Sequence, residues 1–152
     1  MNSHRLVPLA VLALAVAALF ATSSASISRA AALQGHEESA LAEAMEGIRA
    51  DVKQIGKSLE AKDGDLAWKT ICSLQKHLLA AKQELPEKTS SVPEAERAAF
   101  VAEFRTEISR LLKASCDTEE AVLAGKFDEA DRIVKEVIWP MQKPSHKKFR
   151  ND

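Results

Sequence analysis

The sequence predicts an all-α protein, an antiparallel up-down-up-down four-helix bundle, and three observations support this fold class. Of the 152 residues, 46% are apolar and 28% charged, while only 5 are Gly and 5 are Pro, so helix-forming residues far outnumber turn residues. Aromatic residues make up 5% of the chain and Tyr is absent, which disfavours a β-sandwich or barrel. From Leu41 onward, apolar residues recur every three or four positions, the period of an amphipathic helix.

The N-terminal segment is typical of a secretory signal peptide. Arg5 precedes an apolar run from Leu6 to Ala21, and Ser23-Ser24-Ala25 supplies the small residues of a cleavage site. This run is shorter than the roughly 20 residues that span a bilayer, so we expect cleavage, an exported periplasmic product and no stable membrane insertion. The predicted organisation is a signal peptide at 1–25, a flexible lead-in at 26–37 and a bundle at 38–152.

The first two helices are predicted by apolar residues at alternating spacings of three and four. The first helix ends before Gly64, and its inward positions are Leu41, Met45, Ile48, Val52, Ile55 and Leu59. The second is stopped by Pro86, and its inward positions are Ala67, Ile71, Leu74, Leu78, Ala81 and Leu85. Each helix would be marginal by itself, so its apolar stripe has to be buried against the others.

The third and fourth helices follow the same pattern. The third lies between Pro93 and Gly125, with inward positions Val101, Phe104, Ile108, Leu111, Ser115, Thr118 and Val122. The fourth begins near Asp128, with inward positions Ala130, Val134, Val137 and Met141. Pro140 and Pro144 predict a kink or a restart there, and the regular stripe misses His146 by one position. Two short connections and one longer loop make the up-down-up-down order the economical topology.

This topology predicts that Met45 and His146 meet. In a bundle of four alternating helices, the start of the first and the end of the fourth lie at the same pole. Met45 is one turn into the first helix, and His146 is near the end of the fourth. A thioether and an imidazole that face each other form an axial pair suited to haem iron.

At these residues the chain resembles the cytochrome b562 family over about residues 38 to 150. Met45 matches the family's axial methionine, and Ser145-His146-Lys147-Lys148-Phe149-Arg150 matches the C-terminal pattern that contains its axial histidine. Phe104-Arg105 and Ala124-Gly125-Lys126 match two further motifs. The chain departs from the family in having Ile108 where a second aromatic is expected, and in an interval from Gly125 to His146 that is one residue longer.

The resemblance implies an exported bundle that holds one haem b without covalent attachment. Met45 and His146 would be the axial ligands of the iron, Phe104 would pack against the porphyrin, and Arg150 would be the retained basic residue near the histidine. No C-x-x-C-H motif is present for covalent attachment.

A haem with two axial side chains has no open position for a substrate, so the resemblance favours an electron carrier rather than an enzyme. We expect a monomer with an unknown redox partner protein. Because the formal net charge is -1, nucleic acid is not an expected partner. The alternative is a haem-free bundle of the same lineage that acts as a periplasmic interaction or stress-related module.

Cys72 and Cys116 are expected to be free thiols. If the second helix ends near Leu85 and the third begins near Glu94, the residue level with Cys72 is at about position 107. Cys116 would then lie roughly 13 Å further along, beyond the reach of a disulfide. A disulfide would require a different register between these two helices.

Overall fold

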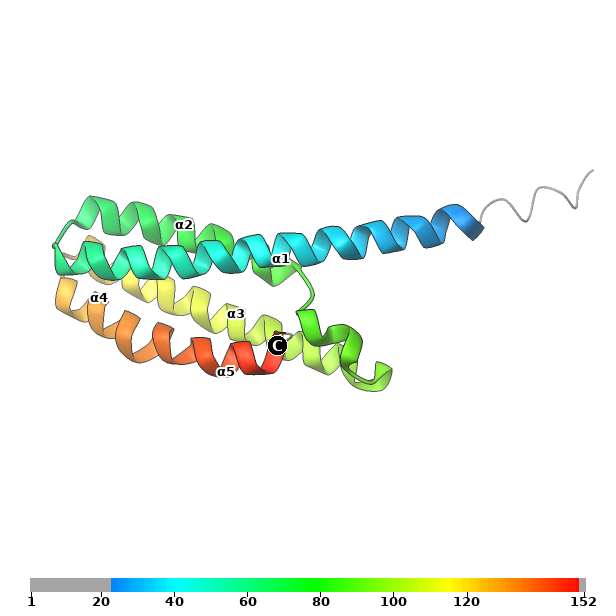
Figure 1. The fold of residues 1–152 in the computed structure, drawn as a ribbon. Coiled ribbons are helices and arrows are strands. Elements are labelled where there is room, and N and C mark those ends of the chain that lie inside the picture. The colour runs from blue at the N-terminus through cyan, green and yellow to red at the C-terminus, as the bar shows by residue number, and fades with distance from the viewer. Residues whose placement is uncertain (1–22, 151–152) are drawn as a thin grey trace, which may run out of the picture. The chain divides into compact units, whose positions relative to one another are not determined.

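The computed structural model describes the backbone of residues 23–150 and the side chains of residues 40–150 apart from Lys143. Its elements are α1 (Ser23–Glu60), α2 (Gly64–Gln83), the 3-10 turn η1 (Glu87–Ser91), α3 (Glu94–Leu123), α4 (Phe127–Ile133), the π-helical stretch η2 (Val134–Ile138) and α5 (Trp139–Phe149) (Figure 1). The described residues contain no strand, which confirms the all-α class. None of the described helices is long and apolar enough to span a membrane.

The chain divides into two compact units, Met1–Gly35 and His36–Asp152, and all the side-chain structure below belongs to the second. Most of the predicted signal peptide lies outside the described residues. The backbone of the expected lead-in, residues 26–37, is part of α1, and its flexibility and the predicted domain boundaries stay predictions.

The ends of α2 and α3 are determined by local interactions and by the backbone preferences of single residues. The Asp63 side chain accepts a hydrogen bond from the backbone N–H of Leu66 at 3.0 Å and so caps the start of α2. Pro93 stands directly before α3. Gly125 ends the same helix with a φ of 72°, a left-handed conformation that a side chain would strain. The predicted boundaries at Pro93 and Gly125 are confirmed.

The core consists largely of the predicted inward positions. Buried side chains include Ile55 of α1, Ile71 and Leu74 of α2, and Phe104 of α3. Two expected core residues are exposed, Leu85 by 41% and Val137 by 44%. For Leu85 the reason is that α2 ends at Gln83, so the residue lies beyond the helix and leaves its stripe.

Val137 is exposed because of the π-helical stretch η2. A π-helical turn holds one more residue than an α-helical turn, so the stripe continues from Val134 to Ile138, which is buried. After Ile138, the inward-facing positions include Gln142, Ser145 and Phe149. The predicted stripe, continued from Val137, would instead have reached Lys148. The shift of the stripe thus occurs in η2, ahead of Pro140, and Pro144 lies inside α5.

Hydrogen bonds between α2 and α3 establish how these helices are aligned. The indole N–H of Trp68 donates to one carboxylate oxygen of Glu119 at 3.1 Å, and the Gln75 amide donates to the other at 2.7 Å. The same amide lies 3.9 Å from the Cys116 sulfur. A later residue of α2 thus contacts an earlier residue of α3, so the two helices are antiparallel.

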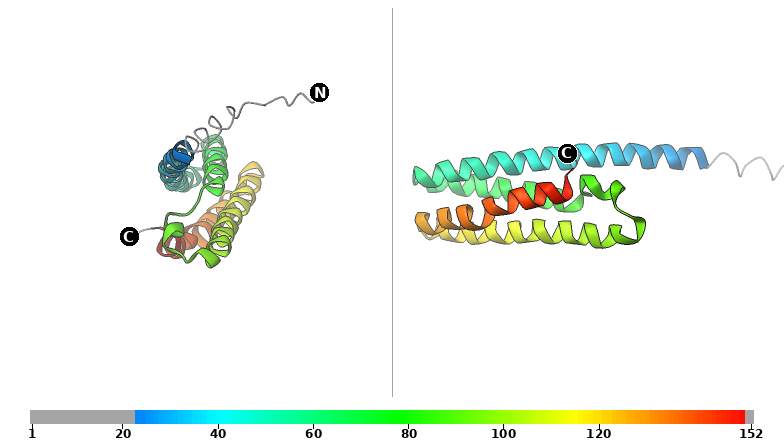
Figure 2. Two further views of the ribbon diagram at one scale, coloured as in Figure 1. Left: turned by 90° about the vertical axis from the view of Figure 1, so that its right-hand side faces the viewer. Right: turned by 60° about the horizontal axis from the view of Figure 1, so that its bottom comes forward.

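The predicted register of these helices is therefore wrong. Cys72 lies between Trp68 and Gln75 on α2, so it is level with the stretch from Cys116 to Glu119 and not with position 107. The reason is that the connection does not turn back directly: the first turns of α3 extend past the end of α2 (Figure 2). Both cysteines are nevertheless free thiols, as expected.

Candidate functional site

A pocket of about 420 Å³ lies between α1, α3 and α5. Its apolar wall includes Leu41 and Ile48 of α1 and Ile108 and Leu111 of α3. Pro86, which is fully buried in the connection before η1, completes one side. A cavity with an apolar wall and few polar groups is suited to a large apolar ligand.

All four residues that the sequence predicted for the site line this pocket. Met45 of α1 is half-buried, and Phe104 of α3 is buried with 2% of its surface exposed. His146 is near the end of α5 and Arg150 directly follows this helix, and both are exposed. The structure thus brings together residues that are far apart in the sequence.

His146 comes to the pocket because of the register that η2 imposes. Ser145 and His146 both line the pocket, one turn before the buried Phe149. Among the described residues, no side chain or backbone group is hydrogen-bonded to the His146 ring. Its imidazole nitrogens are therefore available to a ligand in the pocket.

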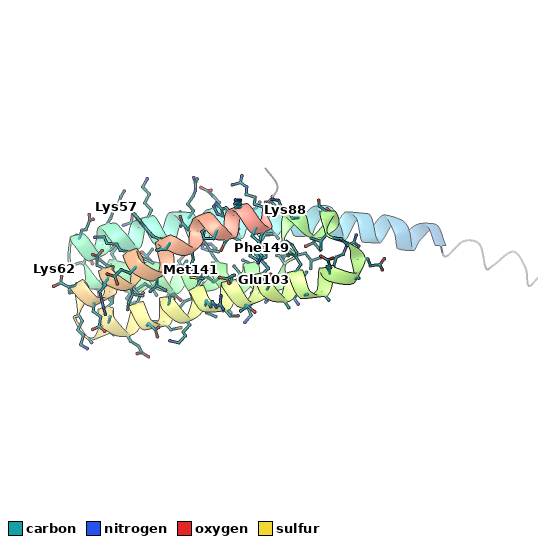
Figure 3. All side chains as sticks on the ribbon, turned by 90° about the horizontal axis from the view of Figure 1, so that it is seen from below. Lys57, Lys62, Lys88, Glu103, Met141 and Phe149 are labelled. Atoms are coloured by element: carbon teal, nitrogen blue, oxygen red, sulfur yellow. The ribbon has the colours of Figure 1, made fainter. Side chains whose placement is uncertain are left out.

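Phe104 and Phe149 line the end of the pocket near the C-terminus of α5, and Phe100 packs against Phe149. The ring of Phe149 lies 5.3 Å from that of Phe104, edge to face, and 5.2 Å from that of Phe100. Figure 3 shows Phe149 between the end of α5 and α3. Phe149 was not predicted as part of the site, nor Phe100 as its packing partner. The spacing of four between Phe100 and Phe104 was the available signal, since it places both rings on one face of a helix.

Met141 is a second thioether in the pocket that the sequence analysis assigned only to the core. It lies on α5, one to two turns before His146, and it is half-buried. The pocket therefore contains one methionine on α1 and another on the helix that carries the histidine.

The charged rim of the pocket is largely paired. Arg49 donates to Glu46 at 2.7 Å, and this hydrogen bond holds the pKa of the exposed Glu46 carboxyl below its usual value. Arg110 likewise pairs with Glu107 at 2.5 Å. Arg150 makes no ion pair within the described residues, so its charge is available to an anionic group at the pocket mouth.

These residues fit a haem. The pocket offers an apolar and aromatic wall for a porphyrin, a thioether and an unpartnered imidazole from two different helices for the iron, and an unpaired guanidinium for a carboxylate. Within the described part of the chain, no group of three or more His, Cys, Asp or Glu residues is placed to hold a bare metal ion.

An all-α fold with such a pocket defines the class of helical-bundle proteins suited to haem. The sequence profile of the family described as Cytochrome b562 matches residues 40–150. The chain therefore belongs to the cytochrome b562 family of haem-binding helical bundles, which confirms the resemblance found in its motifs. A search of curated proteins gave no significant match.

Proposed function

We propose that this protein is an exported electron carrier that binds one haem b without covalent attachment. The observation that carries the proposal is that Met45 and His146, on different helices, line one pocket together with Phe104 and Arg150. Haem supplies one-electron chemistry at its iron when it is bound. If Met45 and His146 both held the iron, no coordination position would be left for a substrate, which favours electron transfer over catalysis.

Met45 is a better candidate for the axial thioether than Met141. Two side chains that together hold one iron would need to reach it from different walls of the pocket. Met141 and His146 are on the same helix and hence on the same wall, whereas Met45 is on α1. Met141 would then pack against the porphyrin edge, as a flexible apolar side chain.

The remaining residues would hold the group in place. Phe104 would lie against the ring, supported from behind by Phe149, which contacts it at 5.3 Å. The unpaired Arg150 would receive a propionate at the solvent-exposed mouth. Because His146 and the mouth of the pocket are exposed, part of the haem would lie near the protein surface. Electrons could pass from there to an as yet unidentified redox partner protein.

We also propose the up-down-up-down order for the bundle. Its supports are the antiparallel hydrogen bonds between α2 and α3, the short turns that separate α1 from α2 and α3 from α4, and the pocket that collects residues from α1 and α5. The apolar run at residues 6–21 supports export to the periplasm, and no further long apolar stripe in the sequence calls for a partner copy, so a monomer is expected.

Absorption spectra of the protein from its own host, oxidised and then reduced, test the haem proposal. We expect the spectrum of a low-spin haem with His/Met ligation, and complete extraction of the haem by acidified organic solvent because no covalent bond holds it. Met45→Ala and His146→Ala should change the spectrum and weaken haem binding. His77→Gln is the matched control because His77 lies outside the pocket, beside Asp51.

Equal spectra and equal haem affinity in the wild type, Met45→Ala and His146→Ala would refute the assigned ligands. Failure of the wild type to bind haem at all would instead support the haem-free interaction module.

A further inference from the structure

Cys72 and Cys116 occupy neighbouring positions on one edge of the bundle, away from the pocket. Trp68 and Gln75 precede and follow Cys72 by about one turn on the same face of α2, and both donate to the Glu119 carboxylate of α3. Cys116 is one turn before Glu119 on α3, and its sulfur is 3.9 Å from the Gln75 amide. Trp68 and Gln75, which flank Cys72 on α2, therefore contact the part of α3 that contains Cys116.

The spacing of packed helices brings these two positions within reach of each other. The axes of packed helices are about 8–10 Å apart and each Cα lies roughly 2.3 Å from its axis, so Cα atoms that face each other directly approach to about 3.5–5.5 Å. A disulfide requires Cα atoms roughly 4.4–6.8 Å apart. Since α2 and α3 are antiparallel and in this register, Cys72 and Cys116 lie within about one turn of each other along the helices rather than several turns apart.

The two thiols differ in accessibility, which sets an order of reaction. Cys116 is exposed, whereas Cys72 is half-buried. An external reagent therefore reaches the Cys116 sulfur first, and Cys72 is the nearby thiol that can act second. An accessible first thiol with a resolving thiol beside it is the arrangement of a redox-sensitive pair.

We propose that Cys72 and Cys116 form a reversible disulfide between α2 and α3, through exchange with a small or protein disulfide. The Cys116 thiolate attacks one sulfur of the oxidant, the oxidant's S–S bond breaks, and one thiolate leaves with the electron pair. The Cys72 thiolate then attacks the Cys116 sulfur of this mixed disulfide and displaces the second thiolate. The protein gives up two electrons and two protons, and the oxidant is reduced to two thiols.

This bond would link α2 to α3 and close a loop that contains the second half of α2, η1 and most of α3. Closing such a loop restricts the unfolded chain, so the oxidised protein should unfold at a temperature several degrees higher than the reduced protein. A thiol reductant should reverse the change. The pair does not depend on haem, because neither cysteine lines the pocket.

Mass spectrometry of the reduced protein after incubation with oxidised glutathione tests the proposal. The wild type should become lighter by two hydrogen atoms and retain no glutathione, and a reductant should restore both thiols. Cys72→Ser should accumulate a glutathione adduct on Cys116, since the resolving thiol is gone. Cys116→Ser should react slowly, because the remaining thiol is half-buried.

A relocated thiol provides the matched control for register. Ser109 lies two turns before Cys116 on the same face of α3, so the double variant Cys116→Ser/Ser109→Cys keeps two thiols but moves one about 10 Å along the helix. This variant should keep its glutathione adduct and form no internal disulfide. The proposal is overturned if the wild type retains glutathione as Cys72→Ser does, or if the relocated pair closes as readily as the native one.

Discussion

The imidazole of His77 on α2 lies directly against Gly47 on α1. A Cβ atom at Gly47 would be only 2.6 Å from the ring atoms of His77, closer than side chains approach each other in proteins. The ring is held in this position by Asp51, whose carboxylate is 2.8 Å from its Nδ1. A glycine in the interior of a helix costs stability, and here the close approach of α2 to α1 accounts for it.

Gly47→Ala should therefore destabilise the protein, although alanine favours helix. The methyl group would displace the His77 ring and break its contact with Asp51, at a cost of roughly 1–3 kcal/mol. Urea unfolding of the haem-free protein measures the change. Gly56→Ala is the matched control: no atom lies within 4 Å of its added Cβ, so it should stabilise by about 0.5–1 kcal/mol.

The double variant Gly47→Ala/His77→Ala separates the clash from any other effect of the substitution. With the ring removed, alanine at position 47 should cost much less than it does in the wild type. An equal cost in both backgrounds would show that His77 is not the obstacle.

Deletion of Val137 should be tolerated because η2 contains one residue more than an α-helix needs. Without this exposed residue, the π-helical stretch can become α-helical while Val134 and Phe149 keep their buried positions. We expect a free energy of unfolding within about 1 kcal/mol of the wild type. The comparison is deletion of the exposed Lys113 of α3, which has no π-helical stretch to absorb it.

Deleting Lys113 should rotate one part of α3 by about 100° relative to the other and expose its buried stripe. That variant should lose cooperative unfolding, as measured by circular dichroism during heating. If the Val137 deletion were equally damaging, η2 would not be a one-residue insertion in an otherwise α-helical segment.

Much of the fold was predictable because helix signals are local. Pro93 and Gly125 act within one turn of where they stand, and the inward stripe of each helix repeats within a few residues. The π-helical stretch was not predictable in this way, because Val137 and Ile138 are both apolar and either one could continue the stripe. Only packing against the other helices selects Ile138.

The register of α2 against α3 and the full set of pocket residues depend on long-range structure. The number of residues between α2 and α3 does not reveal that the connection first extends past the end of α2. For this reason the sequence analysis placed Cys72 opposite the wrong part of α3. Met45 and His146 were predictable together because topology and family motifs agreed on them. Met141 and Phe149 become site residues only when three helices are assembled around one cavity.

Phe149→Ala should destabilise the bundle even without haem. Its ring is 5% exposed and contacts both Phe100 and Phe104, so truncation leaves a cavity at a cost of about 3–5 kcal/mol. Trp139→Ala on the same helix is the matched control, because its side chain is 52% exposed and its removal should change stability by no more than about 0.5 kcal/mol. Urea unfolding of both haem-free variants gives the comparison, and equal losses would contradict the packing described for Phe149.

If His146 holds the haem iron as proposed, acidification should release the haem while the bundle stays helical. A protonated imidazole cannot bind iron, so protons and iron compete for the exposed His146 ring. We expect the low-spin absorption bands to disappear as the pH falls, while far-ultraviolet circular dichroism still reports a helical protein. Simultaneous loss of both signals would mean that unfolding, rather than protonation of the ligand, controls release.

The two pocket methionines should have separable effects on the haem. Met45→Leu removes the sulfur that we assign to the iron, and because a neutral thioether favours ferrous iron, the reduction potential should fall and the oxidised and reduced spectra should both change. Met141→Leu keeps a similar volume on the same wall as His146, so it should leave the ligation spectrum unchanged and alter haem affinity only slightly. Spectroelectrochemical titration of the wild type and the two variants measures both quantities. A fall in potential with Met141→Leu and none with Met45→Leu would instead identify Met141 of α5 as the thioether that holds the iron.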